Sequence, residues 1–336
     1  MTKVRGVNLG GWLVLERWIT PQLFEGTNAQ DEYTFMQTNR ARTKLREHQK
    51  NFIREEDFKW LAKNGINAVR IPVGHWVFDG DTPYVSCIGR LDWAFRMAEK
   101  YKIAILISMH GAPGSQNGRD HSGRIGSVEW YQSTSHREAT IQVLERFARR
   151  YRESPAFWGL QLLNEPRIGL FQWKLRDFYN EAYQRIVAIV WPTTQIVFHD
   201  AFTPRLMSGA VWTHDDRPVV MDIHWYHFLM PLWRYMPISW YVRLILRPRR
   251  HLLRKLKRWQ GVIIGEWGAV IATETFRRYP KEKHERMMDE FAAEQLRVYE
   301  EADGWFYWTY KTEGRGIWNF RSMIEDQRIT LPLRRE

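Results

Sequence analysis

The stretch Trp158-Gly-Leu-Gln-Leu-Leu-Asn-Glu-Pro166 begins as an apolar segment and ends in an acidic residue that is followed at once by proline. A second stretch, Gly261-Val-Ile-Ile-Gly-Glu-Trp-Gly268, has the same form, with Glu266 shortly before a glycine. Short runs of Val, Ile and Leu between turn residues are typical of strands that are buried on both faces. Each stretch therefore predicts a strand of a parallel sheet with a carboxylate at its carboxyl end.

Six further runs have the same strand-like character, and longer amphipathic stretches separate them. The eight predicted strands cover Arg5–Leu13, Asn67–Val73, Lys102–His110, Phe157–Glu165, Thr194–Ala201, Pro218–Tyr226, Gly261–Gly268 and Gly304–Lys311. Helical spacing predicts helices over Glu55–Asn64, Arg90–Tyr101, His136–Arg152, Leu170–Trp191 and Lys281–Ala302, and a short, weak one over Thr203–Gly209. Eight strands that alternate with helices predict an α/β fold, a single (β/α)8 TIM barrel that occupies residues 1–336 as one domain.

Polar and aromatic residues gather where these strands end. They are Asn8, Arg70, His110, Asn164, Glu165, His224, Tyr226, Glu266 and Trp308. Active sites of this fold lie at the carboxyl ends of the strands. Two carboxylates that face each other across such a site are the groups that cleave glycosidic bonds. The sequence therefore predicts a carbohydrate-cleaving enzyme with Glu165 and Glu266 as its catalytic residues.

The composition suits one large domain, since 44% of the 336 residues are apolar. No run of 18 uninterrupted apolar residues is present, which argues against a membrane-spanning helix. The formal net charge of +12 is concentrated between Arg234 and Arg258, where nine Arg or Lys residues occur and no Asp or Glu. Because neither zinc-finger spacing nor an aromatic RNA-binding signature accompanies these charges, we expect no nucleic-acid partner.

Cysteine and histidine usage limits the compartment and the cofactors. The one cysteine, Cys87, excludes an internal disulfide and is consistent with a reducing compartment. The first 30 residues contain no apolar leader segment, so we expect either a protein that stays inside the cell or a trimmed secreted or periplasmic chain. The histidines do not fall into a zinc or iron spacing, and we expect no metal and no other cofactor. The sequence does not indicate an oligomeric state.

Seven strings occur in an order that resembles one enzyme family over nearly the whole chain. They are Arg-Gly-Val-Asn-Leu-Gly-Gly-Trp-Leu (5–13), Asn-Ala-Val-Arg-Ile-Pro (67–72), His-Gly-Ala-Pro-Gly-Ser-Gln-Asn-Gly (110–118), Leu-Asn-Glu-Pro (163–166), Asp-Ile-His-Trp-Tyr (222–226), Gly-Glu-Trp (265–267) and Trp-Thr-Tyr-Lys-Thr-Glu (308–313). Together they closely resemble glycoside hydrolase family 5, especially its exo-β-1,3-glucanase branch. The resemblance implies a cofactor-free retaining β-glycosidase that removes a terminal β-glucosyl unit through a covalent glycosyl-enzyme intermediate.

The resemblance assigns roles to the two glutamates: Glu165 is the general acid/base and Glu266 the nucleophile. The acid needs a raised pKa to hold its proton, and the nucleophile must be ionised. Retention of configuration requires the two carboxyl groups about 5 to 5.5 Å apart. Pro166 predicts an extended backbone at Glu165. Arg70 and Tyr226 are expected to hold the Glu266 carboxylate by a charge-assisted hydrogen bond and a phenol donor.

The remaining candidates are expected to bind the sugar. Asn164 matches the family residue that binds the 2-hydroxyl, a contact that strengthens in the transition state. Trp308 matches the floor under the sugar in the cleaved subsite. Glu16 resembles a glutamate of the exo-glucanase branch that binds sugar hydroxyls at the closed end of a pocket. The other substrate-binding candidates are His110, at the border of the sugar site, and His224.

Two loops depart from the β-1,3-glucanase pattern. The third loop of those enzymes typically reads Asn-Gly-Phe-Asp-Asn-Ser-Gly, whereas residues 117–123 have Arg119 for the phenylalanine and His121 for the second asparagine. After the sixth strand those enzymes read His-x-Tyr-Gln-Val-Phe, and residues 224–229 read His-Trp-Tyr-His-Phe-Leu. Two phenylalanines that would clamp the leaving sugar are thus absent. Their absence puts β-1,3-glucan in doubt as the substrate, and Arg119 is instead expected to meet an anionic or strongly polar group beyond the cleaved bond.

A basic, aromatic segment at about 229–260 follows the sixth predicted strand. One interpretation is the sixth outer helix of the barrel, with its apolar stripe on the sheet and its charges in water. The other is a flap that rests on an anionic membrane surface beside the active site, with a glycolipid head group as the substrate. The sequence leaves both open.

Three further alternatives for function stay open. The enzyme could act on an anionic glycan, or it could transfer the sugar to another acceptor, since hydrolysis and transglycosylation share the covalent intermediate. A catalytically silent carbohydrate-binding barrel is the alternative outside enzymes. The presence of Glu165 and Glu266 together with Arg70 and Tyr226 argues against the last of these.

Overall fold

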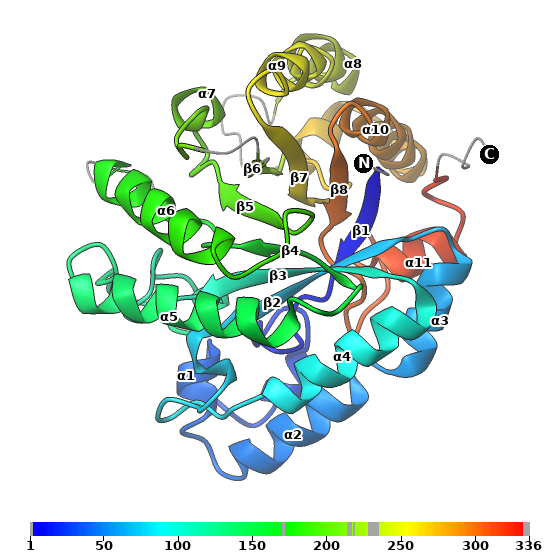
Figure 1. Ribbon diagram of the computed structural model, residues 1–336. Coiled ribbons are helices and arrows are strands. Elements are labelled where there is room, and N and C mark those ends of the chain that lie inside the picture. Colours follow the sequence, from blue (N-terminus) through cyan, green and yellow to red (C-terminus); the bar gives the residue numbers. More distant parts are fainter. Residues whose placement is uncertain are drawn as a thin grey trace.

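The computed structural model describes residues 3–167, 169, 172–213, 217, 219–227 and 235–331. Eight parallel strands close into one barrel in chain order, and helices surround it (Figure 1). The strands are β1 (Val4–Asn8), β2 (Ala68–Gly74), β3 (Ala104–Gly111), β4 (Phe157–Gln161), β5 (Gln195–His199), β6 (Val219–Trp225), β7 (Gly261–Trp267) and β8 (Gly304–Tyr307). The predicted (β/α)8 TIM barrel is thereby confirmed.

Helices occupy the intervals between the strands. They are α1 (Glu32–Phe35), α2 (Ala41–Asn51), α3 (Glu55–Lys63), α4 (Ile88–Tyr101), α5 (Thr134–Tyr151), α6 (Gln172–Val187), α7 (Pro204–Met207), α8 (Ile238–Tyr241), α9 (Arg249–Leu256), α10 (His284–Tyr299) and α11 (Phe320–Glu325). A π-helical stretch, Val242–Leu246, follows α8, and short 3-10 helices cover Pro21–Phe24, His75–Val77, Asp120–Ser122, Thr273–Arg278 and Lys281–Lys283. Within the described ranges, no helix is long and apolar enough to cross a bilayer.

The described part of the basic segment forms the outer helices after β6. Helices α8 and α9 lie on the outside of the barrel between α7 and α10, and α2 lies on the opposite side (Figure 1). This is the position of the sixth barrel helix, as one of the two interpretations had it. Residues 229–234 of the segment lie outside the described residues, as do Pro218 and Leu170, with which two predicted elements begin.

All eight predicted strands are present, but several end earlier than predicted. β1 ends at Asn8, β4 at Gln161 and β8 at Tyr307. Beyond these points the backbone leaves the regular ladder and bonds to neighbouring segments, as the amide of Asn164 does to the carbonyl of Met109 at 2.8 Å. Leu13, Glu165 and Lys311, with which these three predicted strands end, therefore belong to the loops of the barrel mouth. Helices α1, α2 and α11 were not predicted.

The barrel interior consists of an apolar layer below a polar one. Near the amino ends of the strands, the inward side chains are Val4, Ala68, Leu106, Val197, Val220, Ile263 and Phe306. Toward the carboxyl ends, the fully buried side chains are Asn8, Arg70, Gln161, His199 and Asp222. Buried polar and charged groups are tolerated only when they are paired. The fold therefore builds a hydrogen-bonded polar layer directly beneath its mouth.

Candidate active site

A pocket of about 540 Å³ opens at the carboxyl ends of the strands. Eight of the predicted site residues line it: Glu16, His110, Arg119, His121, Glu165, Tyr226, Glu266 and Trp308. The other three, Arg70, Asn164 and His224, are buried and contact the residues that line it. The structure thus brings all the predicted site residues together.

Glu165 lies past the end of β4 in a strained conformation. Its φ of 40° is in the left-handed region, so the extended backbone predicted from Pro166 is wrong. The surrounding loops impose this geometry: the side chain of Asn117 donates to the carbonyl of Glu165 at 3.1 Å, and that of Gln116 to the carbonyl of Asn164 at 2.9 Å. A left-handed residue other than glycine costs about 1–2 kcal/mol. Such strain concentrates at functional sites.

Glu266, on β7, is held by two donors. Nη1 of Arg70 donates to its Oε1 at 2.9 Å, and the hydroxyl of Tyr226 donates to its Oε2 at 2.8 Å. Arg70 is fully buried and also donates to Asn8 Oδ1 at 2.7 Å and Asn164 Oδ1 at 2.6 Å. Because its guanidinium is fixed on several sides, it orients Glu266 rather than merely neutralising it.

One histidine nitrogen joins the two carboxylates. Nδ1 of His224 lies 2.8 Å from Glu165 Oε1 and 3.5 Å from Glu266 Oε2. The distance between these two carboxylate oxygens cannot exceed the sum of their distances to Nδ1. That upper limit is shorter than the ~6.5 Å at which the carboxyl separation of inverting glycosidases begins. The other ring nitrogen, Nε2, lies 3.2 Å from Oδ2 of Asp222, whose Oδ1 accepts the backbone N–H of Gly265 at 2.7 Å. The geometry suits direct attack by one carboxylate.

The protonation of this cluster follows from its contacts. Burial alone would keep His224 neutral, but the charges of Glu266 and Asp222 outweigh it and raise the pKa of His224 to about 10. Burial likewise opposes ionisation of Glu165, yet the hydrogen bond from His224 and the charge of His121 hold the pKa of Glu165 below its ordinary value. Burial raises the pKa of Glu266 against the positive charge of His224. In the free protein the shared proton therefore lies on His224.

The raised pKa expected for an acid is therefore absent at Glu165 in the substrate-free protein. The physical reason is the 2.8 Å contact with His224, which keeps the proton one hydrogen bond away. Delivery of that proton along the contact would leave Glu165 protonated, which is the state that a general acid requires.

Two of the predicted sugar-binding residues, His110 and Trp308, form one wall of the pocket, and a third, Asn164, contacts His110. The rings of His110 and Trp308 are stacked, with their centroids 5.6 Å apart and an interplanar angle of 4°. His110 Nε2 lies 3.4 Å from Asn164 Nδ2. Burial and the charge of Arg70 hold the pKa of His110 well below its ordinary value, so its ring is neutral. A flat indole beside an amide donor is a surface on which a sugar ring can stack and bond.

Glu16 lies on another side of the same pocket. Its Oε2 accepts the indole N–H of Trp18 at 2.9 Å, and its Oε1 is buried with no hydrogen-bond partner among the described residues. Burial, with a contribution from the charge of Asp120, raises the pKa of Glu16 well above its ordinary value. A carboxyl oxygen without a partner in a sugar-sized pocket is suited to a hydroxyl group.

The two residues that depart from the glucanase pattern both reach the pocket. His121 Nε2 lies 3.3 Å from Oε2 of Glu165, a contact that the sequence did not predict. Arg119 is exposed at the pocket rim, one residue before the short 3-10 helix Asp120–Ser122 that carries His121. His121 therefore contacts the Glu165 carboxylate directly, and Arg119 lines the same pocket.

Sequence reasoning missed two buried polar groups behind the pocket. Asp222 anchors His224, and His199 packs edge-on against the His224 ring, with centroids 4.4 Å apart. His199 is the last residue of β5, so the strand-end rule that found the other candidates applies to it as well. The pocket is also lined by four residues that were not predicted: Trp18, Asp120, Phe202 and Trp318.

Glu165, His199 and His224 offer donor atoms that all lie within 4.8 Å of one another, which is close enough to consider a metal ion. His199 Nδ1, however, accepts the backbone N–H of Ala201 at 2.9 Å, so the proton of its neutral ring is on Nε2. A protonated nitrogen has no lone pair for a metal. The donor set therefore fits a network of proton donors and acceptors better than a metal site.

Solved structures share this fold. The rutinosidase from Aspergillus niger superposes with a TM-score of 0.83, at 22% identity and with 98% of both chains covered. The endoglucanase Cel5A from Thermotoga maritima gives a TM-score of 0.56, at 17% identity over 91% of this chain and 89% of that one. At these identities the likeness concerns the fold.

Sequence relatives are closer. The chain is 34% identical to the probable glucan 1,3-beta-glucosidase A of Emericella nidulans over 98% of its own length and 91% of the relative's. It is 39% identical to the glucan 1,3-beta-glucosidase of Pichia angusta over 67% of this chain and 55% of that one. The family model described as cellulase, glycosyl hydrolase family 5, matches residues 28–314. The chain therefore belongs to glycosyl hydrolase family 5 and is a glycoside hydrolase.

Proposed function

We propose that this protein is a retaining β-glycosidase that removes a terminal β-glucosyl unit, with Glu266 as nucleophile and Glu165 as acid/base. The observation that carries the proposal is the position of His224 Nδ1, within reach of both carboxylates. It supports a separation that leaves no room for a water molecule between nucleophile and sugar. The names of the sequence relatives, glucan 1,3-beta-glucosidases, support a β-glucosyl unit as the sugar that is transferred.

In the first step the Glu266 carboxylate attacks the anomeric carbon, and the glycosidic C–O bond breaks with its electron pair on the leaving oxygen. That oxygen takes a proton from Glu165, which has received it from His224. Arg70 and Tyr226 hold the attacking carboxylate in line through their hydrogen bonds. The step ends with a glycosyl ester on Glu266, an ionised Glu165 and a neutral His224.

In the second step a water molecule attacks the same carbon from the side that the leaving group vacated. Its proton goes to Glu165 and back to His224, and the bond to Glu266 breaks with its electron pair on the carboxylate. Two inversions give overall retention. Atoms and charges balance with these residues and one water.

Removal of a terminal unit is supported by the side of the pocket at Glu16. The rings of Trp18 and Trp318 meet edge-on with centroids 5.3 Å apart, and Trp18 also donates to Glu16. These groups line the pocket together. A wall of this kind accepts the end of a chain rather than its middle, as the resemblance to exo-acting enzymes implies.

Hydrolysis of 4-nitrophenyl β-glucoside and of β-linked gluco-oligosaccharides, followed by NMR of the anomeric proton, tests the proposal. Glucose should appear first as the β-anomer, because configuration is retained. Early α-anomer would contradict the assignment of Glu266 as nucleophile. Transfer of glucose to an added alcohol in excess of hydrolysis would show a transglycosylase. A protein that binds these sugars and releases none would be the silent carbohydrate-binding barrel.

A glycolipid head group is the second candidate for the substrate, and it rests on the surface of α8 and α9. Trp240 and Leu244 are 62% and 50% exposed on this surface. Residues 235–259 contain no acidic residue. Exposed Trp and Leu side chains among cations are suited to an anionic membrane surface, where the rings enter the head-group region and the cations meet lipid phosphates.

Not every cation of this segment is available to a membrane. Arg254 pairs with Glu301 at 2.9 Å and Lys257 with Asp303 at 2.6 Å, while Arg249 lies over the Trp225 ring at 4.3 Å. Three others are exposed and have no ion pair with a described residue: Arg243, Lys255 and Arg258. These three are the cations that the membrane proposal requires.

Co-sedimentation with vesicles that contain anionic lipid tests this second proposal. Changing Arg243, Lys255 and Arg258 to Glu should abolish binding at low salt, since each exposed cation contributes about 1 kcal/mol at such a surface. The matched control changes Arg42, Arg46 and Lys50 to Glu on α2, on the opposite side of the barrel (Figure 1). Equal loss in both triple variants would show a net-charge effect only. Binding to neutral vesicles alone would contradict the role of the cations.

A further inference from the structure

His199 is a buried side chain that the mechanism above does not use. It is fully buried at the end of β5, and burial together with the charge of His224 lowers the pKa of His199 to about 3, so its ring is neutral. Because Nδ1 accepts the N–H of Ala201 at 2.9 Å, the ring proton is on Nε2. That Nε2–H group has no hydrogen-bond partner among the described residues.

A buried donor without an acceptor costs about 1–3 kcal/mol. Its surroundings suggest why the fold retains it. A carboxylate oxygen of Glu165 and a ring nitrogen of His224 both lie within 4.8 Å of a His199 ring nitrogen, and the His199 ring stands nearly perpendicular to that of His224, at 82°. Because Nδ1 is occupied by the N–H of Ala201, Nε2–H is the ring group of His199 that is free to donate to this carboxylate.

The need for such a donor arises in the bond-breaking step. Before cleavage, Nδ1 of His224 donates to Glu165 at 2.8 Å. Once that proton has passed through Glu165 to the leaving oxygen, Nδ1 presents a lone pair to an ionised carboxylate. His224 cannot turn its other N–H toward Glu165, because that group is directed at Asp222 at 3.2 Å. Oε1 of Glu165 therefore loses its donor at the moment when the charge forms, while His121 Nε2, 3.3 Å away, faces only the other oxygen, Oε2.

We propose that His199 is a positioning residue whose Nε2–H donates to the Glu165 carboxylate as Glu165 gives up its proton. This deepens the proposed function and rests on Glu165 being the acid. No proton leaves His199: the proton moves from Glu165 to the leaving oxygen, the C–O bond breaks, and the N–H of His199 gains an acceptor. A donor that is fixed in advance stabilises charge where it develops.

Two substitutions distinguish the role of the acceptor Nδ1 from that of the donor Nε2–H in the His199 ring. His199→Asn keeps an acceptor near the N–H of Ala201 but lacks the donor toward Glu165, whereas His199→Gln can place an amide N–H at the donor position. Both are assayed with phenyl β-glucoside, which needs protonation of its leaving oxygen, and with 2,4-dinitrophenyl β-glucoside, which does not. Thermal unfolding of each variant is measured in parallel.

In His199→Asn, kcat/KM should fall about 10- to 100-fold for the phenyl glucoside and less than about threefold for the dinitrophenyl glucoside. His199→Gln should recover most of the loss. A merely structural role would lower both substrates in the same proportion, and that result, or an unchanged phenyl activity, overturns the proposal. A wild-type protein that hydrolyses neither glucoside refutes the proposed function itself.

A measurement on the wild-type protein tests the proposal even where the variants do not fold. Long-range ¹H–¹⁵N NMR of histidine-labelled protein reports which ring nitrogen is protonated. His199 should show an unprotonated Nδ1 and a protonated Nε2 at neutral pH. A proton on Nδ1 would remove the donor from Glu165 and overturn the proposal.

Discussion

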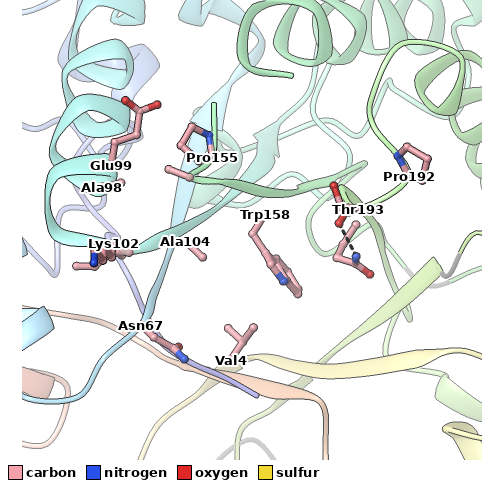
Figure 2. A pocket seen from close by; sticks show the side chains of 13 residues that line it. Val4, Asn67, Ala98, Glu99, Lys102, Ala104, Pro155, Trp158, Pro192 and Thr193 are labelled. Atoms are coloured by element: carbon pink, nitrogen blue, oxygen red, sulfur yellow. Dashed lines mark hydrogen bonds between the residues drawn. The ribbon is translucent and has the colours of Figure 1, made fainter. Parts of the chain in front are cut away.

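A cavity lies at each end of the barrel, and the larger of the two is not the one where the ionisable groups meet. A cavity of about 770 Å³ lies at the amino ends of the strands. Val4, Ala104 and Gln195, the first residues of β1, β3 and β5, line it. The indole of Trp158 projects into it (Figure 2). The pocket at the carboxyl ends has about 540 Å³. Volume alone would select the wrong end.

The two ends differ in what their polar groups bond to. At the amino end, the side chain of Asn67 bonds to the backbone of Lys3 and Arg5, and that of Gln195 donates to the carbonyl of Thr193. At the carboxyl end, buried ionisable groups bond to one another. Arrays of coupled titratable groups in a concave site are typical of catalysis, whereas amides that bond to backbone serve the fold. The difference predicts that changes at the two ends have different consequences.

The largest effect is expected at the two carboxylates. Glu266→Ala should lower kcat by about 10⁴-fold or more, because no nucleophile is left to form the intermediate. Glu165→Ala should lower kcat/KM about 10²- to 10⁴-fold for phenyl β-glucoside and far less for 2,4-dinitrophenyl β-glucoside, whose leaving group needs no proton. Steady-state rates on both substrates measure this. Equal losses on the two substrates in the Glu165 variant would contradict its assignment as the acid.

Two glycines of β7 compare the ends within one strand. A Cβ on Gly265, at the carboxyl end, would lie 2.0 Å from Oδ1 of the buried Asp222, whereas one on Gly261, at the amino end, would meet a Val220 methyl at 3.0 Å. Gly265→Ala should lower the free energy of unfolding by about 3 kcal/mol, since it displaces a buried charge from its partners. Gly261→Ala should cost about 1 kcal/mol or less. Urea unfolding measures both.

A similar loss in the two glycine variants would show that the mouth is no more tightly fitted than the amino end. In that case Asp222 could shift without cost, and the anchoring of His224 would have to depend on other contacts. Activity of a folded Gly265→Ala protein would then be close to that of the wild type.

How far the sequence predicted the molecule can be judged from particular residues. The strands, Glu165, Glu266 and Arg70 were predictable because strand-end position and residue type are local properties. The left-handed backbone of Glu165 was not, because Asn117 and Gln116 from another loop impose it against the local preference of a residue before proline. The proton on His224 depends on Glu266 of β7, Asp222 of β6 and Glu165 in the loop after β4, a combination that no linear pattern contains.

His199 and Asp222 show a different limit. The strand-end rule can point to His199, but a single chain offers no way to know that Asp222 bonds to His224 while the Nε2–H of His199 has no partner among the described residues. Helix α2, whose apolar positions are few, was missed because its buried face consists of Ala41, Leu45 and Gln49. Tertiary contacts, rather than periodicity, determine these features.

The pH dependence of stability should reveal the buried charge of the mouth. The pKa of His224 is raised from 6.5 to about 10 in the folded protein, so its contribution is fully present below its unfolded pKa and is lost as the pH rises through the folded value. The free-energy difference between wild type and His224→Gln should therefore shrink between about pH 7 and pH 10, by no more than about 1.4 kcal/mol per pH unit. Urea unfolding at several pH values measures the difference. A pH-independent difference would mean that the His224 ring is neutral, and not the cation, in the folded protein.

The smallest effect on activity is expected at the amino-end cavity. Trp158 packs against Phe306 with ring centroids 6.5 Å apart, near the apolar layer of the barrel. Trp158→Phe should cost about 1–2 kcal/mol of stability through lost packing and change kcat/KM by less than about twofold. The matched change at the mouth, Trp308→Phe, should lower kcat/KM about tenfold or more, because it removes the indole on which the sugar is expected to stack.

This pair of tryptophans is the sharpest test of the difference between the ends, since the chemical change is identical and only the position differs. Suppose that Trp158→Phe lowered the activity as much as Trp308→Phe while both proteins stayed folded. The apolar layer would then transmit changes to the polar layer above it, and the amino-end cavity would be part of the working enzyme. If only Trp308→Phe lowers it, the polar layer is self-supporting, held by the contacts of Arg70 and Asp222 within the mouth.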